Sequence, residues 1–318
     1  LQLDAIVVDA KDFGLNFNFN ISYNRGKIDK LNGSSFWQSS SWAGTAAAGI
    51  EDFLVEEGGR LGEVYGYKTD GFYTANDFTF DAEKGTYALK EGVNDCSSLI
   101  GGKVYPGSIK LKANEDGEYK KERLGNTVPT VSGGFGLNAR WKGFDFTAFF
   151  NYSLGNKIVN ATKLGSSFYS GSSKNWNIND HFTSASRYSW IDSSTGTNLL
   201  SSASIKANGE AWTINRLNEI NSNASIWNPA AATVMPLVDW AVEDGSFLRV
   251  NNITIGYTLP KLLVNKLNIQ NIRIYVTGYN LHCFTKYSGT DPEVDCCTST
   301  PMTCLLYTSD AADDRISV

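Results

Sequence analysis

No apolar run in the chain reaches the ~20 residues that a membrane-spanning helix requires. The longest candidate, residues 230–242, is interrupted by Pro236 and Asp239. Histidine is scarce, with two in the chain, and the five cysteines include no C-x-x-C pair. The adjacent Cys296 and Cys297 cannot easily form a relaxed disulfide with each other. The sequence therefore argues against membrane helices, a zinc site and a Ser-His-Asp hydrolase.

Charge is also scarce, at 19% of residues, whereas aromatic residues reach 13%. A net charge of -5 gives no reason to expect a nucleic-acid partner. No G-x-x-x-x-G-K-[ST] nucleotide motif occurs. Acidic pairs such as Glu51-Asp52 and Glu56-Glu57 resemble a solvated face more than the paired carboxylates of a glycosidase. We therefore expect a protein that is not an enzyme and that uses no cofactor.

The chain does contain segments in which apolar and polar residues alternate. Across residues 13–24, apolar and amide side chains alternate, so a strand there has one apolar and one polar face. The segment has the length of a tilted strand that crosses a bilayer. A row of asparagines without charge suits a hydrated lumen better than a packed core. This segment is the first indication of a membrane β-barrel.

Other segments repeat the pattern. Residues 133–141 and 144–154 flank Lys142-Gly143, which predicts a hairpin with a two-residue turn. Residues 253–259 alternate after a change of phase, which predicts a bulge near Asn251-Asn252. Phe149 falls on a polar face and breaks the pattern. With residues 1–8 and 271–281, about six spanning strands are expected. The side chains expected to face the lumen are Asn16, Asn18, Asn20, Asn138, Arg140, Asp145 and Asn151.

Two long connections, 25–131 and 155–244, alternate with the short turns. Short turns at one rim and long loops at the other are typical of outer-membrane barrels. Within the second connection, Glu210–Asn223 predicts an amphipathic helix that buries Trp212, Leu217 and Ile220. We predict an all-β fold: a partial antiparallel transmembrane β-barrel with long extracellular loops containing short helices. The alternative is a soluble antiparallel sandwich that binds or cleaves carbohydrate, because sandwich strands also alternate.

Three segments carry a family resemblance. Residues 244–261 read D-G-S-F-L-R-V-N-N-I-T-I-G-Y-T-L-P-K, residues 61–73 read L-G-E-V-Y-G-Y-K-T-D-G-F-Y, and residues 141–156 read W-K-G-F-D-F-T-A-F-F-N-Y-S-L-G-N. Together they resemble the C-terminal barrel of SusC/RagA-type TonB-linked outer-membrane transporters of Bacteroidetes. The resemblance spans nearly all of residues 1–303.

The resemblance implies active nutrient import across the outer membrane of a Gram-negative cell. It implies a large plugged barrel of ~22 strands, surrounded by outer-membrane lipid. It also implies a SusD-like surface lipoprotein as partner, a TonB complex that acts through an N-terminal region not in this chain, and an oligosaccharide or peptide ligand. Aromatic rings stack on sugars, so we expect ligand contacts in the extracellular loops from Trp176, Tyr188, Trp190 and Trp212.

The sequence departs from the family at two places. Where the family often carries a calcium-like D-x-N-x-D-G loop, residues 112–118 read K-A-N-E-D-G-E. Asn114, Asp116 and Glu118 are the remaining candidates for a structural calcium ion. Residues 304–318 resemble translated sequencing-adapter sequence. We therefore expect residues 1–303 to be the native C-terminal barrel portion, without plug, first strands or final strand, and residues 304–318 to be a non-native tail.

Overall fold

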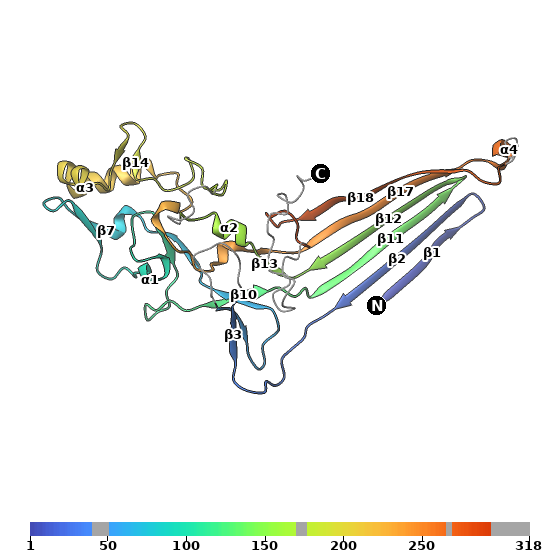
Figure 1. Cartoon of the computed structure of the whole chain (residues 1–318), viewed down its shortest axis with the longest axis horizontal. Coiled ribbons are helices and arrows are strands. Elements are labelled where there is room, and N and C mark those ends of the chain that lie inside the picture. Colours follow the sequence, from blue (N-terminus) through green and yellow to red (C-terminus); the bar gives the residue numbers. More distant parts are fainter. Residues whose placement is uncertain (40–50, 170–176, 265–268, 294–318) are drawn as a thin grey trace, which may run out of the picture.

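The computed structural model describes residues 1–39, 51–169, 177–264 and 269–293 (Figure 1). Its largest element is a six-stranded antiparallel sheet in the order β1-β2-β11-β12-β17-β18. The strands are β1 (Gln2–Asp9), β2 (Phe13–Tyr23), β11 (Val131–Trp141), β12 (Phe144–Leu154), β17 (Phe247–Thr258) and β18 (Arg273–Thr285). The expected all-β partial barrel is confirmed, and so is the expected number of long strands.

The connections at one end of this sheet are short. Lys142 and Gly143 both take positive φ, 47° and 96°, which is the backbone that a two-residue hairpin turn between twisted strands requires. The β1–β2 turn and the short helix α4 (Lys261–Val264), which follows β17, lie at the same end of the sheet (Figure 1). The long connections leave from the opposite end and form a separate body of loops (Figure 1). The predicted asymmetry is confirmed.

The predicted bulge in β17 is also confirmed. Phe149 of β12 pairs with Asn252 and the next residue, Phe150, pairs with Val250, so Asn251 is skipped. The pairing of β17 with β18 shifts at the same place. A one-residue shift in a strand with period two exchanges its faces. The apolar residues that alternate in β17 therefore occupy even-numbered positions before the bulge and odd-numbered positions after it, and their side chains all stay on one face of the sheet.

The apolar face of the sheet is exposed. Ile255 is 56% exposed, Ile274 63% and Val276 74%. In a sandwich, a second sheet would cover such a face and bury these side chains. A continuous exposed apolar face is instead what a wall facing lipid shows. This exposure contradicts the alternative of a soluble sandwich.

The loop body holds the buried core. Its small sheets are built from β3 (Phe36–Ser39), β4 (Glu51–Val55), β5 (Glu63–Gly66) and β10 (Glu122–Asn126), and from the pairs β6 (Thr69–Phe72) with β9 (Ile109–Leu111), β7 (Phe78–Asp81) with β8 (Thr86–Leu89), β13 (Lys157–Val159) with β16 (Val242–Asp244), and β14 (Ile191–Asp192) with β15 (Thr197–Asn198). Its helical elements are η1 (Ala75–Asp77), α1 (Ser97–Ile100), α2 (Ala161–Gly165), α3 (Ser202–Ile220), η2 (Pro229–Ala231) and η3 (Asp239–Ala241). Fully buried side chains from both long connections meet there, among them Tyr73, Phe78, Ile109, Leu164, Leu217 and Met235.

Helix α3 corrects one expectation. It begins at Ser202, before the expected start, and is kinked at Gly209, whose φ is 74°. Leu217 is fully buried and Ile220 partly buried, as expected. Trp212, however, is 45% exposed. Thr213 and Leu217, four residues apart, define the buried side of the helix, and Trp212 points away from it. None of the described helices is both long and apolar enough to span a membrane.

Candidate functional site

The second face of the six-stranded sheet, called here the inner face, carries the polar side chains. All seven residues predicted to share this face do so in the observed register. Asn16 pairs with Asn138, which pairs with Thr147. Asn151 pairs with Arg249 across β12 and β17. That the inner face borders a lumen stays a prediction.

Near the short turns, a row of charges crosses the inner face. The register aligns Asp9, Gly14, Arg140, Asp145 and Gly256 on five successive strands, and Arg273 of β18 lies two residues from Tyr275, the partner of Gly256. Arg140 forms an ion pair with Asp9 across Gly14, and Arg273 forms one with Asp145 across Gly256. A Cβ added to Gly256 would lie 2.6 Å from Asp145 Oδ1. The two glycines therefore let long side chains lie flat, and the row has no net charge.

Phe149 is the aromatic residue on this polar face. It pairs with Gly136 across the strands. Its ring also covers Gly134, where an added Cβ would lie 2.9 Å from Phe149 Cζ. The glycines of β11 thus provide the space that the ring fills. This explains the break in the alternation that the sequence showed without a reason.

Beyond β18, residues 286–293 form a segment tied to the inner face, called here the strap. Arg249, which is 8% exposed, donates to Asp291 at 2.5 Å and pairs with Glu293. Asn151 Nδ2 donates to Glu293 Oε1 at 3.1 Å. A nearly buried guanidinium with two carboxylate partners is a strong, charge-assisted attachment. It holds the strap against β12 and β17.

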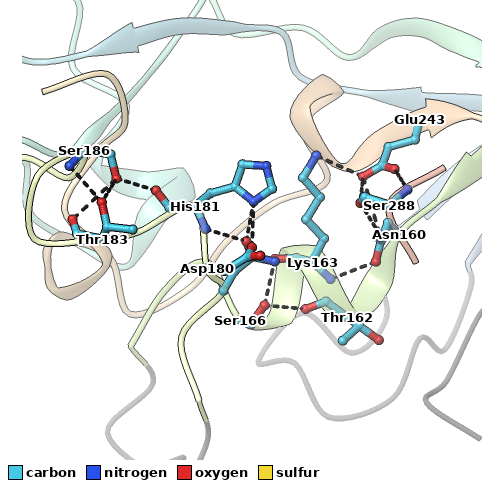
Figure 2. A network of polar contacts seen from close by, with 11 residues as sticks. Asn160, Thr162, Lys163, Ser166, Asp180, His181, Thr183, Ser186, Glu243 and Ser288 are labelled. Atoms are coloured by element: carbon cyan, nitrogen blue, oxygen red, sulfur yellow. Dashed lines mark hydrogen bonds and ion pairs between the residues drawn. The ribbon is translucent and has the colours of Figure 1, made fainter. Parts of the chain in front are cut away.

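A polar pocket of about 350 Å³ lies between the strap and the loop body (Figure 2). Its walls come from α2, from the segment that follows the undescribed residues 170–176, and from the strap. The lining side chains that matter most are Asn160, Lys163, Asp180, His181, Ser288 and Thr290. None of these is a large apolar residue. The volume is at the lower end of the range for small-molecule sites.

Lys163, one of the residues that line the polar pocket, forms an ion pair. Lys163 Nζ lies 2.9 Å from Glu243 Oε1, and each side chain is 11% exposed. Lys163 Nζ also lies 4.3 Å from the centre of the Trp240 ring. Ser288 of the strap donates to Glu243 from its backbone nitrogen at 2.7 Å and its hydroxyl at 2.8 Å. Burial alone would raise the pKa of the Glu243 carboxyl, but these hydrogen bonds and Lys163 outweigh burial and hold that pKa below its usual range.

The opposite wall carries a histidine with a defined orientation (Figure 2). His181 Nδ1 lies 2.6 Å from Asn179 Oδ1 and 3.1 Å from Asp180 Oδ1. The same Asn179 oxygen accepts the backbone N–H of His181, which identifies it as the amide oxygen. Two oxygen acceptors beside Nδ1 place a hydrogen on that nitrogen.

The aromatic residues expected to contact ligand do not gather in one site. Tyr188 is 2% exposed and packs in the loop core against Phe72, so its ring has no free face. Trp190 is half-buried, and its Nε1 donates to the Pro106 carbonyl at 2.5 Å. Trp212 is exposed on α3. Trp176 lies outside the described residues. This placement favours a packing role for Tyr188, and ligand contact by the other three stays a prediction.

The expected calcium residues form a closed turn. Asn114 Oδ1 accepts the backbone N–H of Glu118 at 2.7 Å, and the Glu118 carboxylate pairs with Lys120 at 2.8 Å. Asp116 is exposed. Calcium needs several converging oxygens, and among the described residues no group of three or more His, Cys, Asp or Glu side chains is placed to hold a metal ion. Calcium binding at this turn stays a prediction that the arrangement does not support.

The polar pocket was missed in the sequence. Asn160 and Ser288, whose side chains bond to each other at 3.3 Å, are 128 residues apart. No local periodicity joins such residues. The local signal in the sequence is the polar run S-G-T-D-P-E at residues 288–293, to which no periodic pattern assigns a role.

Comparisons with known proteins agree with this fold. No protein-family model matches the chain. Among curated proteins, it is 28% identical over 294 residues to TonB-dependent receptor P3 of Formosa agariphila, covering 91% of this chain and 24% of that protein. It is 24% identical over 306 residues to TonB-dependent receptor P39 of the same organism, covering 87% and 25%. The chain thus spans about a quarter of the length of these relatives.

Among solved structures, the chain is similar to one of the RagAB peptide importer in its closed-closed state. The TM-score is 0.57 at 20% identity, over 92% of this chain and 26% of that one. This likeness concerns the fold. The resemblance to TonB-linked receptors of Bacteroidetes that the sequence motifs indicated is confirmed by the curated relatives.

Proposed function

We propose that this chain is part of the wall and extracellular loops of an outer-membrane importer driven by TonB. The observation that carries the proposal is the sheet with two opposite surfaces. Side chains such as Val276 expose an apolar face, and asparagines and compensated charges cover the inner face. That combination suits a wall between lipid and a hydrated passage. The relatives are receptors rather than enzymes, and we propose transport without catalysis.

The two outer strands support a longer wall. In the described structure, β1 and β18 each pair on one side only. Open strand edges are not stable within a bilayer. We infer that further strands complete the barrel in the whole protein. We likewise propose that residues 1–303 are the barrel portion and that residues 304–318, which lie outside the described residues, are a non-native tail.

The partners and cargo follow from the same proposal. Long loops at one rim would receive solute and contact a SusD-like lipoprotein, while a segment outside this chain would engage the TonB complex. The cargo would be an oligosaccharide or a peptide; the solved neighbour is a peptide importer. The loop body has its own buried core, so it offers a stable surface for both contacts.

Cell fractionation and uptake of the complete protein test this proposal. We expect it in the outer-membrane fraction, with gel mobility that changes on heating, as for other barrels. A cell that lacks TonB should keep the protein in the membrane but lose uptake. A complete protein that purifies without detergent from the soluble fraction would overturn the proposal.

A further inference from the structure

We propose that a groove on the apolar face of the six-stranded sheet binds a phosphorylated lipid of the surrounding membrane. Its acyl chain lies along the groove, and its phosphate group lies at Lys286. The site is on the opposite face from the inner face, so it is separate from the path of the solute. It rests on the proposed function only where that function places the apolar face in lipid.

The groove lies at the end of the sheet from which the long connections leave, where β12 and β18 end. Its volume is about 590 Å³, within the range of sites that bind small molecules. Five neighbouring strands, β2, β11, β12, β17 and β18, contribute to it. The large apolar and aromatic residues that line it are Phe19, Phe135, Tyr152, Leu154, Leu248 and Phe284. Hydrocarbon is the covering that such a lining favours.

A position without a side chain shapes the middle of the groove. Leu248 of β17 pairs with Tyr152 of β12, and Tyr152 pairs with Gly133 of β11. The Tyr152 hydroxyl donates to the Asn20 carbonyl of β2 at 3.1 Å, and a Cβ added to Gly133 would lie 2.7 Å from that hydroxyl. The tyrosine ring therefore lies along the sheet over Gly133 instead of standing away from it. This leaves room above the ring for a chain that crosses the strands.

A lysine lies at the polar end of the groove. Lys286 directly follows β18, lines the groove and is exposed. Asp244 also lines the groove, but Lys157 lies directly opposite it on β13, and its Oδ1 accepts the backbone N–H of Ser246 at 3.0 Å. Hydrogen bonds from Ser246 and the ammonium groups of Lys157 and Lys286 hold the pKa of the Asp244 carboxyl below its usual range. Two ammonium groups thus share one carboxylate, which leaves one positive charge at this end.

This arrangement matches a lipid with an anionic headgroup. In the proposed function the long loops face the outside, so this end of the sheet lies at the depth of the outer headgroups. A lysine at that depth attracts an anionic headgroup, while the acyl chain covers the rings of the groove. A water-soluble ligand would have to cross lipid to reach the same rings. The apolar lining and the unbalanced lysine together therefore favour a lipid that carries a phosphate.

A matched pair of photoactivatable probes tests the inference: a phosphatidic acid and a diacylglycerol with the same diazirine-bearing acyl chains, which differ by one phosphate. The complete protein in neutral detergent is illuminated at increasing probe concentration, digested and mapped by mass spectrometry. We expect saturable labelling of the groove peptides, about fivefold stronger with phosphatidic acid at low concentration. Lys286→Gln should remove this preference, and Lys286→Arg should keep it. Phe284→Ala should weaken labelling by both probes about threefold.

The control variants lie at the other end of the apolar face. Lys142→Gln removes an exposed lysine beside the exposed Trp141 ring, and Ile274→Ala shortens an exposed apolar side chain. Neither should change labelling of the groove. Equal labelling by the two probes, labelling that does not saturate, or equal effects of Lys286→Gln and Lys142→Gln would overturn the inference.

A second copy of the chain that covers the groove would also overturn it. The groove peptides would then be shielded from both probes, and the particle mass would be doubled. Membrane location and TonB-dependent uptake are scored separately on the same protein. A protein that inserts and imports without labelling of the groove contradicts the lipid site alone, whereas a protein that does not insert contradicts the proposed function.

Discussion

Arg273 reaches across Gly256 to pair with Asp145, with its Nε 3.0 Å from the Asp145 Oδ1 atom. The two charged residues lie on strands that are not neighbours, and the glycine of the strand between them makes the contact sterically feasible. The pair therefore links three strands through side chains in addition to their backbone hydrogen bonds. The ion pair between Arg273 and Asp145 therefore depends on the absence of a side chain at Gly256.

Gly256→Ala should separate this pair. The added Cβ would lie 2.6 Å from Asp145 Oδ1 and 2.7 Å from an Arg273 terminal nitrogen, so the side chains must move. We expect a loss of ~1–3 kcal/mol in the free energy of unfolding, the usual cost of overpacking. Urea unfolding of the complete protein in detergent measures it. Gly26→Ala, where a Cβ meets nothing within 4 Å, is the control and should change little; equal effects at both positions would refute the explanation.

Val276→Arg should prevent stable insertion. Val276 is 74% exposed on the apolar face, and an arginine facing lipid costs roughly 1–4 kcal/mol depending on its depth. Outer-membrane yield and folded fraction on unheated gels report the effect. Asn16→Arg places the same side chain at an exposed position of the inner face and should insert normally. If Asn16→Arg is the more harmful change, the two faces have been assigned the wrong way round.

Attachment of the strap should depend on pH through Glu243. Its folded pKa is lowered, so its contribution is complete above the unfolded value of about 4.3 and is lost as pH falls through the lower folded value. Exchange of the Ser288 amide hydrogen, which Glu243 accepts, should stay protected from pH 7 to about 5. Below about pH 4 this protection, measured relative to an unfolded peptide at the same pH, should be lost. Glu243→Gln should show weaker protection without this acid-dependent step.

Tyr188→Ala and Trp212→Ala separate packing from ligand contact. Tyr188 is buried, and Gly107, at φ 89°, packs directly against its ring. Its truncation should cost ~3–5 kcal/mol and expose the loop body to protease. Trp212→Ala should stay within ~0.5 kcal/mol of the unmodified protein because the ring is exposed. Any loss of ligand affinity in Trp212→Ala would then reflect contact, and destabilisation by that variant would contradict its placement.

The long strands were predictable because their signal is local. Alternation across Phe13–Tyr23 is set by the geometry of the strand itself, and the change of phase before Asn252 revealed the bulge. The prediction that Trp212 is buried was wrong because the sequence does not show which side of α3 packs against β7. That side is decided by packing between segments far apart in the chain. The polar pocket was hidden for the same reason. Lys163 and Glu243 pair over 80 positions, beyond the reach of any periodic pattern.

The bulge at Asn251 has a consequence for how this wall can change in evolution. Removing that one residue would restore simple alternation and rotate the strand above it by half a turn. Arg249, now held by Asp291 and Glu293, would then lie on the apolar face of the sheet, and Leu248 on the inner face. An insertion or deletion in β17 therefore keeps each side chain on its face only if it contains an even number of residues, or if β18, whose pairing shifts at the same level, changes with it. The single skipped residue thus limits the lengths that both strands can take.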